Sequence, residues 1–206
     1  METLEKKIET SSEIIAEADK KYGKRLVMAS SFGMHSAVML HLAGKIIPAI
    51  NVIFVDTEYL TDETYRFADN LKKDLGIDLK IFRPAISRQM REALHGKNLS
   101  YNSGQEQFRF DLKAEPFERA LRELKARACL FGNMRHENEN RKFFSVYMKK
   151  NNIWRVYPIL EWSEDDILRY IEKYELPVNV NYYDICKGAE QETECGIHCF
   201  KGGEGI

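Results

Sequence analysis

Cysteine and histidine side chains gather near the carboxyl end of the chain, where Cys186, Cys195, His198 and Cys199 follow one another closely. A cysteine thiolate is a strong nucleophile, and a neighbouring positive charge favours it by lowering the pKa of the thiol. His198 stands three residues after Cys195 and supplies such a charge when protonated, whereas the adjacent Glu194 opposes it. Cys195 is therefore a candidate nucleophile, with His198 and Glu194 as candidate catalytic residues beside it.

The same group of residues allows other interpretations. Three thiolates and one imidazole can hold a structural zinc ion, but their spacing is uncommon among zinc sites, so we expect no metal. Cys199 can act instead as a resolving thiol that displaces a group from Cys195. The cysteines can also be incidental in a glycine-rich terminal segment. We expect residues 186–206 to form a flexible catalytic tail behind a single α/β nucleotide-binding domain of residues 1–185.

A serine-rich loop follows the first apolar segment of the chain, where residues 30–36 read SSFGMHS. A glycine allows close backbone approach, serine hydroxyls donate hydrogen bonds, and a following helix offers unpaired N–H groups, which together suit a phosphate or sulfate group. The loop matches neither the P-loop nor the dinucleotide-binding motif. A serine-capped helix without a ligand is the simpler alternative. The expected substrate-binding residues here are Ser30, Ser31, Phe32, Gly33 and Ser36.

Short apolar segments alternate with helical patterns along the chain, as is typical of buried parallel strands. The sequence predicts an α/β fold with a doubly wound, mostly parallel sheet flanked by helices. Loops 30–36, 56–59 and 132–141 follow predicted strands, so they should meet in one crevice beyond the strand ends. Residues 95–112 are expected to form a loop. The predicted strands are 25–29, 50–57, 78–84 and 128–133. The first predicted helix covers roughly the first twenty residues, and another begins after Thr61. The remaining predicted helices are 37–45, 86–94, 115–124 and 163–174.

The composition indicates a globular chain of 206 residues with 44% apolar and 31% charged side chains. The formal net charge of −1 does not favour general binding to nucleic acid or to an anionic membrane. Basic side chains nevertheless outnumber acidic ones between residues 119 and 155, which suits an anionic substrate. No apolar run approaches the roughly 18 to 20 residues of a membrane-spanning helix, and no secretory signal is visible, so we expect a cytoplasmic protein.

Several segments resemble a known family. The loop at 30–36 resembles a modified pyrophosphate loop of adenine nucleotide alpha hydrolases, with His35 in the place of their aspartate. The segment VDTEYLTDETYRF at 55–67 is similar to a motif of the phosphoadenylyl sulfate (PAPS) reductases, and KAEPFERALREL at 113–124 and ECGIH at 194–198 resemble further segments of that family. The resemblance implies an adenine nucleotide alpha hydrolase-like fold. It also implies that Cys195 attacks the sulfuryl sulfur of the nucleotide, forms an S-sulfocysteine and releases adenosine 3′,5′-bisphosphate.

The resemblance extends the expected substrate site. Asp56 and Thr57 stand at the end of the second predicted strand, within the motif, where they can contact the nucleotide. Arg135 and Arg141 match two arginines of the family's G-x-R-R-x-x-Q-S-x-x-R stretch. These four residues are expected to bind the substrate. Met134 replaces a further arginine of that stretch, so the oxyanion ligands differ here from the family pattern.

Cofactors and partners follow from the same resemblance. No iron–sulfur cluster is expected, because the cysteine pairs of the cluster-carrying adenylyl sulfate (APS) reductases are missing, and this favours PAPS as the substrate. Thioredoxin or glutaredoxin is the implied electron donor, and a homodimer is the implied assembly. Three alternatives stay open: an APS reductase without a cluster, an ATP-consuming adenylating enzyme, and a zinc-stapled nucleotide-binding module. His35 in place of the aspartate argues against the adenylating enzyme.

Overall fold

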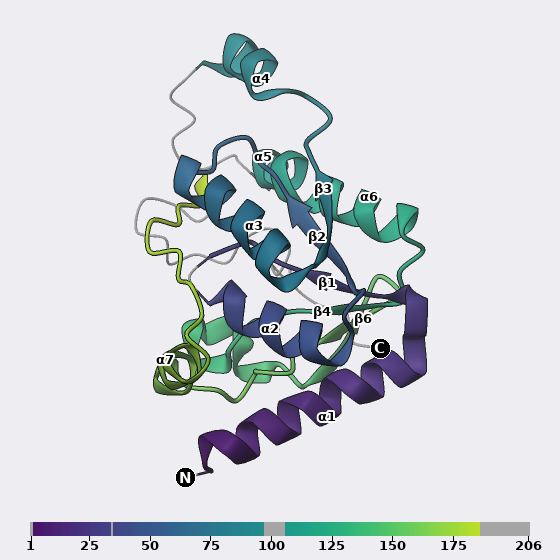
Figure 1. The fold of residues 1–206 in the computed structure, drawn as a ribbon. Coiled ribbons are helices and arrows are strands. Elements are labelled where there is room, and N and C mark those ends of the chain that lie inside the picture. Colours follow the sequence, from purple (N-terminus) through teal and green to yellow (C-terminus); the bar gives the residue numbers. More distant parts are fainter. Residues whose placement is uncertain (1, 34, 97–105, 186–206) are drawn as a thin grey trace.

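The computed structural model of the chain describes residues 2–33, 35–96 and 106–185. Within them, a six-stranded sheet in the order β3-β2-β1-β4-β6-β5 lies between two layers of helices (Figure 1). The strands are β1 (Leu26–Ala29), β2 (Asn51–Val55), β3 (Asp78–Phe82), β4 (Ala128–Leu130), β5 (Tyr147–Lys150) and β6 (Ile153–Val156). The helices are α1 (Leu4–Tyr22), α2 (Ser36–Ile46), α3 (Asp62–Leu75), α4 (Arg88–His95), α5 (Glu106–Arg109), α6 (Glu115–Glu123) and α7 (Glu164–Lys173). The predicted doubly wound, mostly parallel sheet is confirmed.

The central strands bury side chains on both faces, which explains their continuous apolar sequences. Along β1, Leu26 and Met28 join the core under α1, α2, α3 and α7, whereas Val27 joins the core under α6. The same alternation is seen in β2, where Ile53 faces α6. Neighbouring strands run parallel to each other in every pair except β5 and β6, which are antiparallel. The sheet thus has two closed faces and is open to ligands at the ends of its strands.

The order of the strands creates a switch point between β1 and β4. The chain runs from β1 outward through β2 to β3, and then returns to place β4 on the other side of β1. The loops that leave the carboxyl ends of β1 and β4 therefore diverge, and the space between them is the usual ligand position in such sheets. The loop of residues 30–36 and the segment from Gly132 onward begin at this point.

Side-chain caps begin two of the predicted helices. Thr61 caps α3, because its hydroxyl accepts a hydrogen bond from the Thr64 N–H at 3.2 Å. Ser163 and Asp166 form the reciprocal capping box of α7. Among the described residues, no helix combines the length and the apolar character needed to cross a membrane.

The expected loop at 95–112 is wrong for residues 106–112. There, α5 continues through a π-helical turn, Phe110–Ala114, into α6. The Glu115 N–H bonds to the carbonyl of Phe110, and Pro116 follows without an N–H of its own, which interrupts the regular helical ladder. Such wide turns often occur at functional sites. This one buries Lys113, whose side chain lines the pocket described below.

The hairpin of β5 and β6 was not predicted. Asn151 and Asn152 connect the two strands with φ angles of 48° and 63°. Two consecutive left-handed residues are the signature of a tight hairpin turn whose twist matches the strands, and asparagine adopts this conformation more readily than most residues. The hairpin places β6 beside β4 and completes the sheet on that side.

Candidate active site

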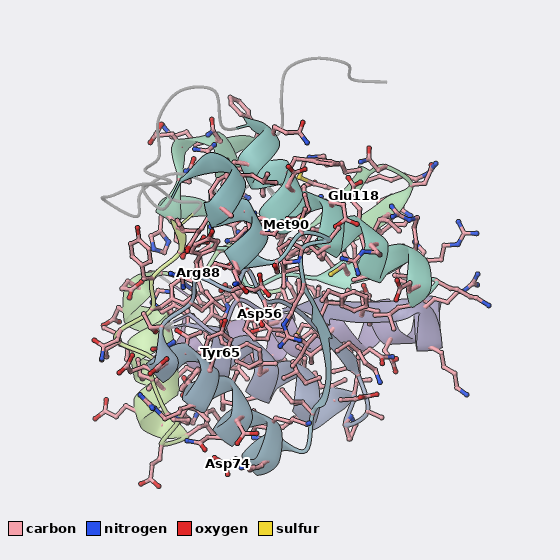
Figure 2. The ribbon with its side chains drawn as sticks, turned by 90° about the horizontal axis from the view of Figure 1, so that it is seen from above. Asp56, Tyr65, Asp74, Arg88, Met90 and Glu118 are labelled. Carbon is pink, nitrogen blue, oxygen red and sulfur yellow. The ribbon has the colours of Figure 1, made fainter. Side chains whose placement is uncertain are left out.

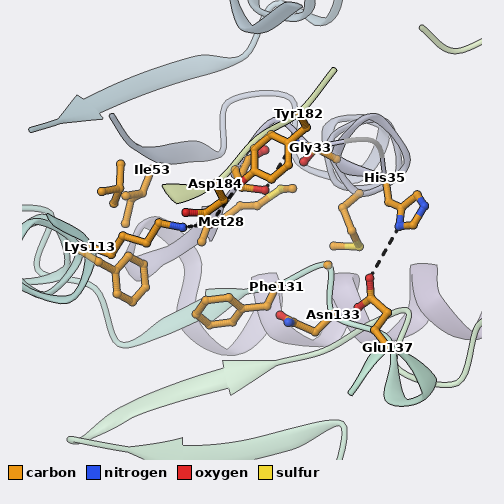
Figure 3. Close-up of a pocket in the computed structure, with 18 of the residues that line it drawn as sticks. Met28, Gly33, His35, Ile53, Lys113, Phe131, Asn133, Glu137, Tyr182 and Asp184 are labelled. Atoms are coloured by element: carbon orange, nitrogen blue, oxygen red, sulfur yellow. Dashed lines mark hydrogen bonds and ion pairs between the residues drawn. The ribbon is translucent and has the colours of Figure 1, made fainter. Parts of the chain in front are cut away.

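A pocket of about 290 Å³ with both polar and apolar walls opens at the switch point between β1 and β4 (Figure 3). The loop after β1 forms one wall, and the segment after β4 forms the opposite wall. The π-helical turn and the chain that follows α7 complete it. Gly33 lines the pocket together with the described polar residues Ser30, Ser31, His35, Ser36, Thr57, Lys113, Asn133, Glu137, Arg141, Tyr182 and Asp184. The predicted meeting of three loops at one crevice is therefore seen in the structure.

Phe32 holds the serine-rich loop in position. Its φ angle of 55° lies in the left-handed region, which is uncommon for a bulky residue and is found where the surroundings fix the backbone. Its ring is fully buried and meets Phe54 edge-on at 4.9 Å. The loop closes on itself, since Ser30 and Ser31 accept hydrogen bonds through Oγ from Phe32 N and Gly33 N. Each hydroxyl keeps its own hydrogen to donate to a ligand.

The segment after α7 crosses over this loop. Asn179 donates hydrogen bonds to the Phe32 carbonyl at 2.8 Å and to the Thr64 hydroxyl at 3.0 Å. Tyr182 reaches the pocket wall, and its hydroxyl bonds to Asp184 at 3.3 Å. Residues 179–184 therefore tie α3 and the loop after β1 to the rim of the pocket.

Lys113 and Asp184 form a buried ion pair in the pocket (Figure 3). Their side chains are only 7% and 1% exposed, respectively. A buried charge is stable when a partner compensates it, so each residue holds the other in its ionised form. The pair places a cation from the π-helical turn and a carboxylate from the final described segment at one end of the pocket.

Glu137 and Arg141 form a second ion pair within the pocket wall that follows β4. Arg141 also donates to the Met134 carbonyl at 3.0 Å, and Glu137 accepts from the Met134 N–H at 3.0 Å. Burial alone would raise the pKa of Glu137, but the contacts with His35, Arg141 and the Met134 N–H outweigh it and lower the pKa to about 2. Glu137 is therefore ionised at neutral pH.

His35 joins the two walls of the pocket. Its Nε2 lies 2.9 Å from Glu164 at the start of α7, and its Nδ1 lies 3.7 Å from Glu137. Burial of the ring disfavours the charged form, but the two carboxylates outweigh burial and raise the pKa of His35. The His35 ring thus links the loop after β1 to the loop after β4 and to α7.

Replacing His35 with glutamine is expected to make the free energy of unfolding less dependent on pH. The pKa of His35 is higher in the folded chain than its ordinary value of 6.5, so protonation of His35 stabilises the fold. This stabilisation is complete below pH 6.5 and is lost as the pH rises through the pKa of the folded state. Near pH 6 we expect the free energy of unfolding of the wild type to exceed that of the variant by on the order of 1 kcal/mol, and we expect this difference to shrink above pH 7. Urea unfolding across that range measures it. Glu164→Gln serves as a matched control that should reproduce part of the effect, and a difference independent of pH would contradict the assignment.

The structure brings most of the predicted substrate-binding residues together. Ser30, Ser31, Gly33, Ser36, Thr57 and Arg141 line the pocket. Phe32 is not among the residues that line the pocket, and its buried ring supports the serine-rich loop. Asp56 lies beside the pocket, where its carboxylate accepts from the Tyr65 hydroxyl at 2.6 Å and from Arg83 at 2.9 Å (Figure 2). Asp56 thereby orders the turn that carries Thr57.

Arg135 points away from the pocket. Its guanidinium binds Glu161 and donates to the Phe144 carbonyl at 2.7 Å. These contacts hold the loop after β4 against the segment that precedes α7. Arg141, not Arg135, is the arginine of this stretch that lines the pocket.

Four charged pocket residues were not among the predicted site residues: His35, Lys113, Glu137 and Asp184. Lys113 opens the KAEP segment that carried part of the resemblance, so the sequence held a signal for it. His35 stands where the related loop has an aspartate, and this departure was the available signal for it. Nothing in the local sequence around Asp184 indicated its pairing with Lys113, from which it is 71 residues distant.

The predicted catalytic residues Glu194, Cys195 and His198 lie outside the described residues, as do Cys186 and Cys199. The predicted division into residues 1–185 and a tail, and the alternative zinc site, therefore stay predictions. Within the described ranges, no group of three or more histidine, cysteine or acidic residues is arranged to hold a metal ion. The described Cys129 is buried in the core, and burial raises the pKa of its thiol.

The fold is the adenine nucleotide alpha hydrolase-like one. Among solved structures, the PAPS reductase of Candida auris in a phosphate complex is similar, with a TM-score of 0.72, 24% identity and 82% coverage of each chain. An FMN adenylyltransferase of Candida glabrata in complex with ATP has a TM-score of 0.62 at 15% identity, covering 85% of this chain and 56% of that one. The sequence model of the phosphoadenosine phosphosulfate reductase domain matches residues 25–186. The chain belongs to that family.

Curated relatives support the same assignment. A phosphoadenosine 5′-phosphosulfate reductase of Synechocystis sp. is 39% identical over 179 residues, which cover 85% of this chain and 72% of the relative. A phosphoadenosine 5′-phosphosulfate reductase of Alkalilimnicola ehrlichii is 34% identical over 200 residues, which cover 86% of this chain and 82% of the relative. The chain is therefore an oxidoreductase that acts on a sulfur group, and its family supports sulfonucleotide reduction in sulfate assimilation.

Proposed function

We propose that this enzyme reduces PAPS to sulfite and adenosine 3′,5′-bisphosphate through an S-sulfocysteine on Cys195. The thiolate attacks the sulfuryl sulfur, the S–S bond forms, and the bond from sulfur to the phosphate oxygen breaks. Thioredoxin or glutaredoxin, as a dithiol, then supplies two electrons. It leaves as a disulfide, while Cys195 returns to the thiol and sulfite is released. Family membership, through the match over residues 25–186, is the observation that carries the proposal.

The pocket is chemically suited to this substrate. A phosphosulfate is a compact anion, and the pocket presents the hydroxyls of Ser30 and Ser31 with the cations Lys113 and Arg141 around one volume. Donors fixed before the reaction stabilise charge that develops on the leaving phosphate. Both cations are paired with carboxylates, Asp184 and Glu137, which keeps them in place in the unliganded pocket. The bound nucleotide would add its own negative charge to these networks.

Mass spectrometry of the purified, reduced enzyme tests the proposal. Incubation with PAPS in the absence of any thiol donor is expected to add one SO₃ group per chain, and peptide mapping should place it on Cys195. Addition of reduced thioredoxin should remove the group and release sulfite. APS in a parallel reaction should label the enzyme more slowly. A chain that releases adenosine 3′,5′-bisphosphate without any covalent intermediate would overturn the proposed mechanism.

A further inference from the structure

The fixed charges that line the active-site pocket cancel one another. Apart from His35, the cations among the described lining residues are Lys113 and Arg141. The carboxylates are Glu137 and Asp184, so the positive and negative charges sum to zero. Each cation also forms an ion pair with one of these carboxylates, and a carboxylate beside a cation weakens the attraction of that cation for a second anion. The fixed charges alone therefore give the pocket little attraction for a nucleotide that carries several negative charges.

His35 decides the sign of the charge that remains in this pocket. Its mostly buried imidazole is part of the pocket wall. No other histidine is found among the described residues that line the pocket, and histidine is the side chain whose ordinary pKa lies near neutral pH. These lining residues are neutral in sum when the ring is neutral, and they carry one positive charge when the ring is protonated.

The contacts of His35 place its charge where it can offset Glu137 (Figure 3). The ring nitrogen Nδ1 lies 3.7 Å from Oε1 of Glu137. The other oxygen of this carboxylate, Oε2, bonds to Arg141 and accepts from the Met134 N–H at 3.0 Å. The two oxygens of Glu137 therefore face two different cationic side chains when His35 is protonated. In that state His35 offsets part of the negative charge of Glu137, which leaves more of the positive charge of Arg141 for a ligand.

Glu164, at the start of α7, contacts the other nitrogen of the His35 ring. Its Oε1 lies 2.9 Å from Nε2, its side chain is 45% exposed, and it does not line the pocket. Water screens an exposed carboxylate, so Glu164 favours the protonated ring but offsets little of the ring's charge inside the pocket. Glu137 from the loop after β4 and Glu164 from α7 are thus the acidic groups that face the ring, and Arg141 is bonded to the far oxygen of Glu137.

We propose that the charge of His35 determines how tightly the pocket binds its anionic nucleotide, so that binding is coupled to protonation of the ring. The proposal rests on the proposed function, which supplies the anionic nucleotide. It makes His35 a specificity-determining residue, because an uncharged ligand such as adenosine gains nothing from this positive charge. By linkage, the bound anion favours the protonated ring in return.

Titration calorimetry with adenosine 3′,5′-bisphosphate at about pH 6 and about pH 9, on either side of the ordinary histidine pKa, tests the proposal. The measured quantity is the dissociation constant of His35→Gln divided by that of the wild type. The nucleotide's own phosphates titrate alike in both experiments, so their effect cancels in this ratio. We expect a ratio of about 10 at the lower pH, where the wild-type ring is charged, and of about 1 at the higher pH, where it is neutral.

Three further measurements separate charge from structure. His35→Lys keeps a cation at the higher pH, so it should bind the bisphosphate about 10-fold more tightly there than the wild type does. If His35→Gln does not fold, His35→Asn and His35→Lys carry the same comparison. His136→Gln is the matched control: His136 lies beside Glu137 on the same loop, but it bonds to the Trp162 carbonyl at 3.1 Å and does not line the pocket. Its ratio to the wild type should be about 1 at both pH values, as should the ratio for adenosine with His35→Gln.

The outcomes are distinct. A ratio that is the same at both pH values would overturn the proposal, because His35 would then act through the structure of the pocket alone. Equal losses for adenosine and for the bisphosphate would overturn it as well. A wild type that forms the SO₃ adduct but gives a ratio independent of pH refutes the role of His35 and leaves the proposed function standing. A wild type that forms no adduct with either sulfonucleotide refutes the proposed function, whatever the ratio is.

Discussion

Replacing Cys195 with serine is expected to lower the rate of sulfite formation from PAPS by about 10³-fold or more, the loss found when a covalent nucleophile is removed. A serine hydroxyl is almost entirely protonated at neutral pH, so the attacking anion is absent. The chemistry also fails at the second step. Attack by a serine oxygen would give a sulfate ester, which has no S–S bond for a dithiol to exchange. A coupled thioredoxin assay measures the turnover rate, and intact-mass measurement shows whether an SO₃ group is added.

Two other cysteines provide the controls for this experiment. Cys129 is buried between β1 and β6, and its thiol has a raised pKa, so Cys129→Ala should keep the full yield of the adduct. Cys199→Ser tests the alternative in which Cys199 resolves the intermediate. We expect its sulfite release to be unchanged in the presence of thioredoxin. Full activity in Cys195→Ser would exclude this thiol from the reaction.

The parts of the fold that were predicted correctly depend on local signals. Continuous apolar runs such as the one in β2 are buried on both faces, and Thr61 and Ser163 cap their helices through residues three positions away. The parts that were missed depend on backbone geometry that the apolar pattern does not encode. The turn at Asn151 and Asn152 and the π-helical turn before Pro116 are both of this kind.

The parts of the candidate site that were predicted also depend on local signals, and the parts that were missed do not. The serine-rich loop could be recognised because its hydroxyls, glycine and helix start are contiguous in the sequence. The charged pairs could not be recognised, because they join distant positions: His35 and Glu164 are 129 residues apart. Arg135 and Arg141 looked equivalent in sequence, but the loop after β4 turns one toward Glu161 and the other into the pocket. The direction of a side chain on an irregular loop follows from its tertiary contacts, and these follow from the fold as a whole.

Replacing Lys113 with methionine is expected to reduce both stability and activity. Asp184 is 1% exposed, and without Lys113 it would be a buried carboxylate that has lost its cation. Breaking one partner of a buried pair costs about 3–5 kcal/mol in the free energy of unfolding, which urea denaturation at pH 7 measures. The pocket would also lose a cation next to the proposed phosphosulfate position. We expect kcat/KM for PAPS to fall by about 10²-fold, as for other preorganised electrostatic groups.

The double variant Lys113→Met/Asp184→Asn separates the two effects of Lys113. It removes both charges of the pair, so most of the lost stability should return, because no carboxylate is left unpaired in the interior. Activity should stay low, because the cation is still missing. The exposed pair of Lys73 and Asp69 on α3 gives the matched control, and Lys73→Met should change neither stability nor activity measurably. If the double variant recovers activity together with stability, Lys113 acts through the fold alone and the pocket does not use its charge.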